Sequence, residues 1–353
     1  MRLAHRIGGV LLTATVAAAA LTATAANADA RPGAQAPHVD TRVSGTTLPP
    51  IPNTVGEGPA SSGFWSGYAY GQLNPNAAPK GANDFHCKPK DGRNPVVLVH
   101  GTYENAYDNW AAFSPVLKKV GYCVFAPNYG RTDLLDKGGV AIVMPGVQGV
   151  ASIRRSSEQL GAYIDRVRKA TGSDKVDIIA HSQGGLVARH WIKFGGGADR
   201  TDPAKNKVGK LIMFGTPNHG TTLDGLAAFG RAIDDLGLPV MEFYSWLYGA
   251  GPIDQAVGSP AVKAVNAGRM TYPGIEYTSV ATEYDEVVTP FDSAFIRGGG
   301  VQNIVLQHGC EADTSDHLSM VYSSRAMSIA LRALDPKTYP KLVCAPNVWA
   351  FSF

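Results

Sequence analysis

Short apolar runs alternate along the chain with longer segments in which apolar residues recur every three or four positions. A short run bounded by turn residues is typical of a buried strand, and the longer spacing is typical of a helix that buries one face. The runs predict strands over 95–100, 122–127, 178–180, 211–214, 277–281 and 303–307. The longer segments predict helices over 110–120, 153–171, 186–194 and 318–334. This alternation indicates an α/β fold with a mostly parallel sheet and helices on both faces.

The strand over 178–180 leads into Ala180-His181-Ser182-Gln183-Gly184, and a second glycine then opens the helix over 186–194. Strand, serine, glycines and helix in this order are the context of a nucleophile elbow, where a strained turn projects the serine hydroxyl above the sheet edge. Alanine replaces the first glycine of the usual G-x-S-x-G pattern but is still small enough for the turn. The alternative is that Ser182 only caps a helix. The flanking pattern favours a nucleophile.

The N-terminal residues have the pattern of a secretory signal peptide. A basic start precedes an apolar run over 10–26, and cleavage after Ala28 or after Ala30 fits the small-residue rule. The run is rich in Ala and Thr and is marginal in length for a membrane anchor. We therefore expect a signal peptide over 1–28, a flexible Pro- and Gly-rich tail over 29–62, and a secreted protein.

Residues 63–353 are expected to form one globular domain. The aromatic cluster over 64–70 either packs onto this domain or borders a substrate site, and packing is favoured. The segment 221–264 fits the alternation poorly and carries many large apolar residues. It is either extra core or a cap above the functional edge of the sheet. We favour a cap or lid over about 223–262.

Composition and charge narrow the range of partners. The chain has 353 residues, of which 44% are hydrophobic, so it can bury a sizeable core. Its formal net charge of +3 includes Arg2 and Arg6 of the signal, so the mature chain is near +1 (3 − 2). This is too neutral to indicate a nucleic acid as partner. No segment after the signal is long and apolar enough for stable membrane insertion.

The four cysteines suit an oxidising compartment. They allow three pairings. We expect Cys87–Cys123 and Cys310–Cys344, because each pair closes a local loop. No cysteine has the spacing of a metal ligand.

A serine nucleophile needs a base within hydrogen-bond reach and a carboxylate that orients the base. In a sheet of this type the chain order is serine, acid, histidine. Asp285 is the candidate acid because it follows the strand over 277–281. Glu283, Glu286 and Asp292 lie near enough to compete.

The candidate base is His317, in the loop between the last strand and the last helix. His308, directly at the strand end, is the rival. A catalytic histidine must reach back over Ser182, which favours the longer loop. Cys310 lies between the two histidines and could pin that loop through a disulfide.

Attack on an ester carbonyl places negative charge on its oxygen, which two backbone N–H groups should stabilise. One belongs to the residue after the nucleophile, Gln183. The other comes from the loop after the first strand, where Thr102 follows His100-Gly101. We expect Thr102 and Gln183 to form this oxyanion hole.

Four motifs together resemble the secreted actinobacterial-type triacylglycerol lipases and esterases of the α/β-hydrolase superfamily. They are Val99-His100-Gly101-Thr102, Ala180-His181-Ser182-Gln183-Gly184-Gly185, Asn218-His219-Gly220-Thr221-Thr222 and Ala281-Thr282-Glu283-Tyr284-Asp285-Glu286-Val287-Val288-Thr289-Pro290. The resemblance covers about 64–334. It implies that Asp285 is the triad acid and His317 the base, and that acyl esters are hydrolysed without a cofactor. The sequence has no match to the calcium and zinc sites of some other lipase families, so we expect no bound metal.

The expected function is therefore hydrolysis of carboxylic esters through an acyl-enzyme, with acylglycerols at a lipid–water interface as substrate and a monomer as the active form. Three alternatives stay open at this stage. One is a short-chain carboxylesterase or polyester hydrolase, another an acyltransferase, and the last a non-catalytic surface-binding protein with the same fold.

Overall fold

The computed structural model describes residues 58–132, 144–222, 245–246 and 248–350. All of these belong to one unit of the chain, Leu48–Phe353. The predicted signal peptide over 1–28 and the tail up to residue 57 lie outside the described ranges. Among the helices of these ranges, none combines the length and the apolar composition that a membrane span requires.

In the described part of the chain six parallel strands form the sheet, which confirms the predicted α/β class. They are β1 (Val96–Val99), β2 (Val124–Phe125), β3 (Val176–His181), β4 (Val208–Phe214), β5 (Glu276–Ala281) and β6 (Val301–Val305). Their order across the sheet is β2-β1-β3-β4-β5-β6, with every neighbouring pair parallel. All carboxyl ends therefore lie at one edge, and β3, which leads to Ser182, lies in the middle of the sheet.

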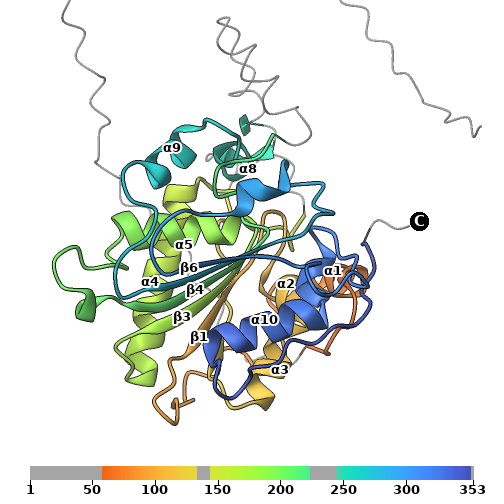
Figure 1. Cartoon of the computed structure of the whole chain (residues 1–353), viewed down its shortest axis with the longest axis horizontal. Helices are drawn as coiled ribbons and strands as arrows, with labels where there is room; N and C mark the ends of the chain where they lie inside the picture. Colours follow the sequence, from red (N-terminus) through yellow and green to blue (C-terminus); the bar gives the residue numbers. More distant parts are fainter. Residues whose placement is uncertain (1–57, 133–143, 223–244, 247, 351–353) are drawn as a thin grey trace, which may run out of the picture. The chain divides into compact units, whose positions relative to one another are not determined.

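Successive strand residues point to opposite faces of the sheet. In β1, Val97 and Val99 belong to the apolar core on one face, and Val96 and Leu98 to the core on the other. The helices that cover the two faces in the described residues include α4 (Ile153–Thr171) and α5 (Gln183–Phe194) on the first, and α3 (Phe113–Lys119) and α10 (Ser324–Leu334) on the second (Figure 1). Both faces are thus buried, as the continuous apolar runs of the sequence predict.

The predicted helix over 110–120 is two helices, α2 (Ala106–Trp110) and α3. A continuous helix would place Pro115 in its interior, where the residue lacks the N–H that bonds the Ala111 carbonyl. With the break, Pro115 falls in the first turn of α3, where N–H groups have no partner within the helix.

The predicted helix over 318–334 is also divided, into the 3₁₀ helix η5 (Ser319–Tyr322) and α10. Ser323 between them is extended, and its Oγ accepts hydrogen bonds from the N–H groups of Arg325 and Ala326 at 3.0 and 3.1 Å. This is the geometry of an N-cap, so Ser323 begins a new helix.

The aromatic cluster near the N-terminus forms a helix that the sequence pattern did not predict, α1 (Phe64–Leu73). Its two internal glycines disfavour a helix in isolation. Both are required by close packing here, because a Cβ at Gly67 would lie 2.0 Å from Tyr322 Oη and one at Gly71 would lie 2.9 Å from Asp108 Cβ. Tertiary packing therefore determines α1.

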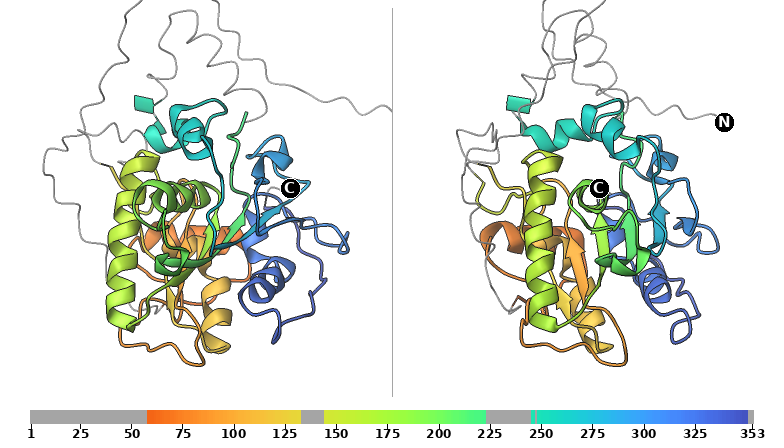
Figure 2. Two further views of the ribbon diagram at one scale, coloured as in Figure 1. Left: turned by 60° about the vertical axis from the view of Figure 1, so that its left-hand side comes forward. Right: turned by 90° about the vertical axis from the view of Figure 1, so that its left-hand side faces the viewer.

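The segment predicted as a lid is described only in part, because residues 223–244 and 247 lie outside the described ranges. The rest contains α8 (Ala250–Asp254), and α9 (Pro260–Asn266) begins near its end. α8 contacts α4, and α9 contacts α5; both lie above the upper end of α4 in the views of Figure 2. The lid itself stays a prediction.

Candidate active site

Ser182 lies in the turn between β3 and α5, with φ 50° and ψ −125°. A positive φ is rare for a residue with a side chain and stores strain, as expected in a nucleophile elbow. The side chain makes no capping hydrogen bond to α5. The structure therefore disfavours the alternative that Ser182 serves only as a helix cap.

The two glycines after Ser182 permit the close crossing of α5 over the sheet. A Cβ at Gly184 would lie 2.4 Å from the carbonyl oxygen of Val99, and one at Gly185 would lie 2.0 Å from Thr216 Oγ1. Only glycine fits at these positions, which places the start of α5 directly against the neighbouring strands.

Asp285 and His317, the predicted acid and base, are in direct contact. His317 Nδ1 lies 3.0 Å from Asp285 Oδ2. Asp285 Oδ1 accepts hydrogen bonds from the N–H groups of Val287 and Val288 at 3.1 and 2.7 Å, which fix the carboxylate. The His317 ring packs on Gly215, where a Cβ would lie 3.1 Å from Nδ1. The loops after β5 and β6 thus place this pair at the carboxyl edge of the sheet.

The rival residues lie elsewhere or contact the site differently. Glu283 and His308 form an exposed ion pair with each other, 3.5 Å between Oε1 and Nε2. Glu286 Oε2 accepts a hydrogen bond from the backbone N–H of His317 at 3.3 Å and does not contact its ring nitrogens. Asp292 lies in η4 (Phe291–Ala294). The geometry therefore favours Asp285 and His317 over these alternatives.

The charge environment of His317 favours its protonated form. Burial by itself lowers the pKa of this imidazole, but the neighbouring carboxylates of Asp285, Glu286 and Glu104 outweigh that effect and raise the pKa from 6.5 to about 9. An imidazole with this environment is stabilised as the cation that forms when a base takes a proton from serine.

Thr102 and Gln183 lie beside Ser182, as predicted for the oxyanion donors. Gln183 is the first residue of α5, so its N–H has no acceptor within the helix. Thr102 borders the same cavity as Ser182, and its Oγ1 accepts a hydrogen bond of 2.8 Å from Gln255 Nε2. Gln255 was not predicted from the sequence because it lies far along the chain, in the segment after α8.

An apolar cavity of about 340 Å³ opens above these residues. Ser182 and His317 border it together with Phe64, Trp65, Tyr68 and Leu318. The aromatic cluster was expected to pack on the domain, and it also forms one wall of this cavity. A cavity of this kind, mostly apolar with a few converging polar groups, suits a small apolar ligand.

The family model described as "Lipase (class 2)" matches residues 93–325. The chain belongs to the class 2 lipase family. The match includes Thr102, Ser182, Asp285 and His317, whereas α1 lies before it.

Curated relatives of this chain include triacylglycerol lipases. Those of Pseudarthrobacter phenanthrenivorans and Burkholderia plantarii are each 31% identical to it over 134 residues, or 36% of this chain. The matched part spans 34% and 31% of their own lengths, so the chain covers about a third of each relative. The solved structure of Aspergillus fumigatus lipase B is similar in fold, with a TM-score of 0.52 and 20% identity over 73% of this chain and 55% of that one.

The chain has both predicted disulfides, Cys87–Cys123 and Cys310–Cys344. The second ties the loop before His317 to the C-terminal segment. Further along that segment the N–H of Ala350 donates to Asp316 Oδ2 at 2.7 Å. The candidate base is thus held from the C-terminal side of the chain as well as by Asp285.

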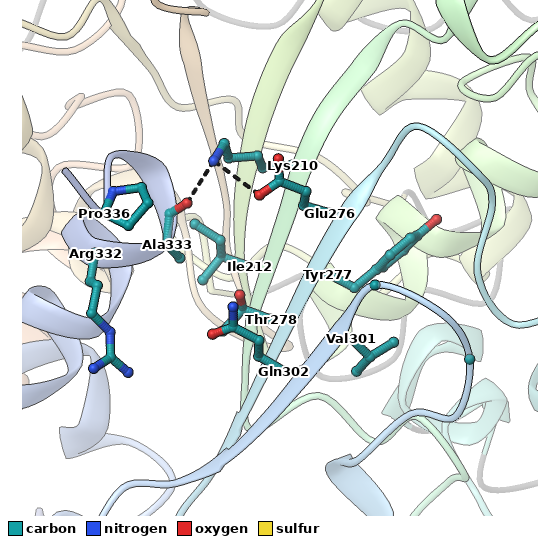
Figure 3. Close-up of a pocket in the computed structure, with 12 residues that line it drawn as sticks. Lys210, Ile212, Glu276, Tyr277, Thr278, Val301, Gln302, Arg332, Ala333 and Pro336 are labelled. Carbon is teal, nitrogen blue, oxygen red and sulfur yellow. Dashed lines mark hydrogen bonds and ion pairs between the residues drawn. The ribbon is translucent and has the colours of Figure 1, made fainter. Parts of the chain in front are cut away.

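A second cavity, of about 600 Å³, lies at the opposite ends of β4, β5 and β6, next to α10 (Figure 3). Lys210 there donates hydrogen bonds to Glu276 Oε2 and to the Ala333 carbonyl at 3.2 and 2.9 Å. The residues that line it include no serine, cysteine or histidine. It therefore holds no Ser–His or Cys–His pair. Within the described ranges, no group of three or more His, Cys, Asp or Glu side chains is placed to hold a metal ion.

Proposed function

We propose that this protein hydrolyses carboxylic esters, with acylglycerols as its substrate class, through a triad of Ser182, His317 and Asp285. The observation that carries the proposal is the contact between His317 and Asp285 beside the strained Ser182, with Ser182 and His317 on one apolar cavity. The match to triacylglycerol lipases supports it.

In the proposed reaction the Ser182 hydroxyl attacks the ester carbonyl while His317 Nε2 takes its proton. Nε2 is assigned this role because Nδ1 is bound by Asp285. Asp285 fixes the tautomer of the ring and stabilises the imidazolium without accepting its proton. His317 then gives the proton to the leaving alcohol. A water molecule activated by the same histidine finally releases the acid and frees Ser182.

The N–H groups of Thr102 and Gln183 are the proposed donors to the oxyanion. Loss of one such donor in a serine hydrolase costs on the order of 10²–10³ in kcat. Because both donors are backbone groups, side-chain substitutions at these positions are expected to reduce activity less than the loss of a triad residue.

The cavity wall supports an acyl chain as the apolar part of the substrate. Phe64, Trp65 and Tyr68 from α1 form that wall with Leu318 beside His317. Each CH₂ group buried there contributes about 0.8 kcal/mol. Trp65 and Trp349 are also partly exposed, at 49% and 43%, which suits contact with a lipid–water interface.

We also propose that the protein is exported. Two disulfides in the described chain fit an oxidising compartment, and the signal pattern over 1–28 fits the same route.

The test is hydrolysis of p-nitrophenyl esters from acetate to palmitate by the purified protein, with Ser182→Ala measured beside it. The proposal predicts activity that extends to long acyl chains and is lost in the variant. Activity confined to the shortest chains would identify a short-chain esterase instead. Transfer of the acyl group to an added alcohol in preference to water would identify an acyltransferase.

A further inference from the structure

Glu104 is a buried carboxylate between two of the loops that carry the proposed chemistry. Its Oε2 accepts a hydrogen bond from the N–H of Gly101 at 3.1 Å and lies 2.9 Å from His181 Nδ1. Its Oε1 accepts a hydrogen bond of 3.1 Å from Asn109 Nδ2. Gly101 adjoins the oxyanion donor Thr102, and His181 adjoins Ser182, so one carboxylate contacts the neighbour of each.

His181 extends this network to the third loop. Its Nε2 lies 2.9 Å from the carbonyl oxygen of His317. A carbonyl oxygen only accepts, so Nε2 carries a proton and donates it. On the other side of the ring Nδ1 faces Glu104 Oε2 and Asn109 Nδ2, each at 2.9 Å. One proton must lie between Nδ1 and Oε2, because two lone pairs would repel each other at that distance. The ring therefore connects Glu104 to the backbone of the candidate base.

We propose that Glu104 and His181 are positioning residues for the reaction. The pair fixes the backbone of the oxyanion loop at Gly101, and that of the base loop at His317, relative to Ser182. This inference rests on the proposed function, because it assigns the two residues no chemistry beyond holding the groups that react.

The close approach of Glu104 to the backbone requires a glycine at position 101. A Cβ at Gly101 would lie 2.2 Å from Glu104 Oε2 and 3.2 Å from Ser182 Cβ. A buried ionisable pair also adds little net stability over apolar residues of similar volume. Its location among three loops of the site therefore favours a positioning role over a purely stabilising one.

The variant Glu104→Gln keeps the shape of the side chain and cannot keep all three contacts. If the amide oxygen faces Gly101, its contact with His181 needs a proton on Nδ1, and the ring then either carries an uncompensated charge or gives up its bond to His317. Without that proton Nδ1 accepts from Asn109 Nδ2, and the contact with residue 104 is lost. If the amide nitrogen faces His181, it meets the N–H of Gly101 as a second donor. Either orientation loses one contact.

We expect Glu104→Gln to lower kcat for p-nitrophenyl butyrate by about 10- to 10²-fold with KM changed by less than about twofold, because misplaced reacting groups affect kcat more than binding. The acidic inflection of kcat/KM should also move to lower pH. The charged and titratable groups that face His317 are Asp285, Glu286, Glu104 and the ring of His181, and the variant removes one negative charge that raises the pKa of His317.

The matched control is Asp177→Asn, a buried carboxylate at the other end of β3 that accepts a hydrogen bond of 3.0 Å from Asn94. It should keep the kcat and inflection of the parent. A kcat and an inflection for Glu104→Gln that match those of Asp177→Asn would overturn the proposal. Ser182→Ala is measured in the same series: equal hydrolysis by parent and Ser182→Ala would show that the proposed function itself is wrong.

A measurement on the unsubstituted protein covers the case in which Glu104→Gln does not fold. With ¹⁵N-labelled histidine, the proposal predicts that His181 Nε2 is protonated near neutral pH and that its proton exchanges slowly with water. An unprotonated Nε2 would overturn the proposal regardless of any activity measurement.

Discussion

At the scale of single residues, Ser182, Asp285 and His317 each lie directly after a strand or in the loop that follows it. Their positions could be predicted because the order of strand ends determines which loops meet at the sheet edge. The contact of Asp285 with His317, rather than of Glu283 with His308, required the structure. The longer loop and the resemblance favoured His317 and Asp285 in the sequence, and the loop conformations place these two in contact and pair Glu283 with His308.

The raised pKa of His317 leads to a prediction for the pH dependence. A protonated imidazole cannot accept the Ser182 proton, so kcat/KM should rise as pH rises through the pKa of about 9, above the ordinary value of 6.5. Asp285→Asn removes the nearest carboxylate, so the inflection of its residual activity should move to lower pH, with kcat reduced by roughly 10⁴-fold.

Glu283→Gln is the control for this pH profile, because Glu283 pairs with the exposed His308 and not with His317. Its inflection should coincide with that of the parent. An inflection of the parent at or below pH 6.5 would contradict the charge environment described for His317.

At the scale of elements, the strands and the long helices could be predicted from periodicity. A central strand and an amphipathic helix each have a pattern of apolar residues that is visible in the local sequence. α1 was not predicted, because Gly67 and Gly71 disfavour a helix and are explained only by Tyr322 and Asp108. The break at Ser323 was missed for a related reason. Apolar residues continue at helical spacing across Ser323. The break depends on the hydrogen bonds that the Ser323 side chain accepts from the backbone, which the apolar pattern does not reveal.

The wall formed by α1 should determine acyl-chain preference. Trp65→Ala removes an aromatic surface from the cavity, so the ratio of kcat/KM for palmitate to that for acetate should fall on the order of tenfold, at about 0.8 kcal/mol per lost CH₂ contact. Leu73→Ala, at the exposed end of the same helix, is the control. An unchanged ratio in Trp65→Ala would place the acyl chain elsewhere.

The close approach of α5 to β1 should be sensitive to a single methyl group. Gly184→Ala would bring a Cβ to 2.4 Å from the Val99 carbonyl, so we expect the free energy of unfolding in urea to fall by about 1–3 kcal/mol or more. Gly299→Ala, where a Cβ meets nothing within 4 Å, should leave it unchanged. Equal stability of the two variants would show that α5 at Gly184 does not lie this close to the Val99 carbonyl of β1.

At the scale of the whole chain, the two disulfides close loops of similar size, with sequence separations of 36 and 34 residues. Loops of this length suggest about 3–4 kcal/mol of stability for each bond in the chain-entropy model. Only Cys310–Cys344 holds the loop of His317. The two bonds should therefore matter alike for stability and differently for activity.

Replacing each pair by serines tests this difference. Both double variants should unfold at lower urea concentration by similar amounts. Under conditions where both are folded, the variant without Cys310–Cys344 should lose kcat, and the variant without Cys87–Cys123 should keep it. Equal kcat in the two variants would show that the C-terminal tie does not contribute to the site.

The network of Glu104, His181 and His317 could not be predicted from the sequence, because its contacts join residues that are 77 and 136 positions apart. Neither Glu104 nor His181 has a spacing that signals the pairing. Such long-range polar contacts depend on how the strands order in the sheet, which local patterns do not specify.

The central claim is that Ser182 is the nucleophile of an ester hydrolase. The most direct measurement is labelling of the folded protein with a fluorophosphonate, followed by mass spectrometry of its peptides. We predict one adduct, on Ser182, which forms at the same rate as esterase activity is lost. The adduct should be absent in Ser182→Ala. An adduct on another residue, or equal labelling of parent and variant, would contradict the claim.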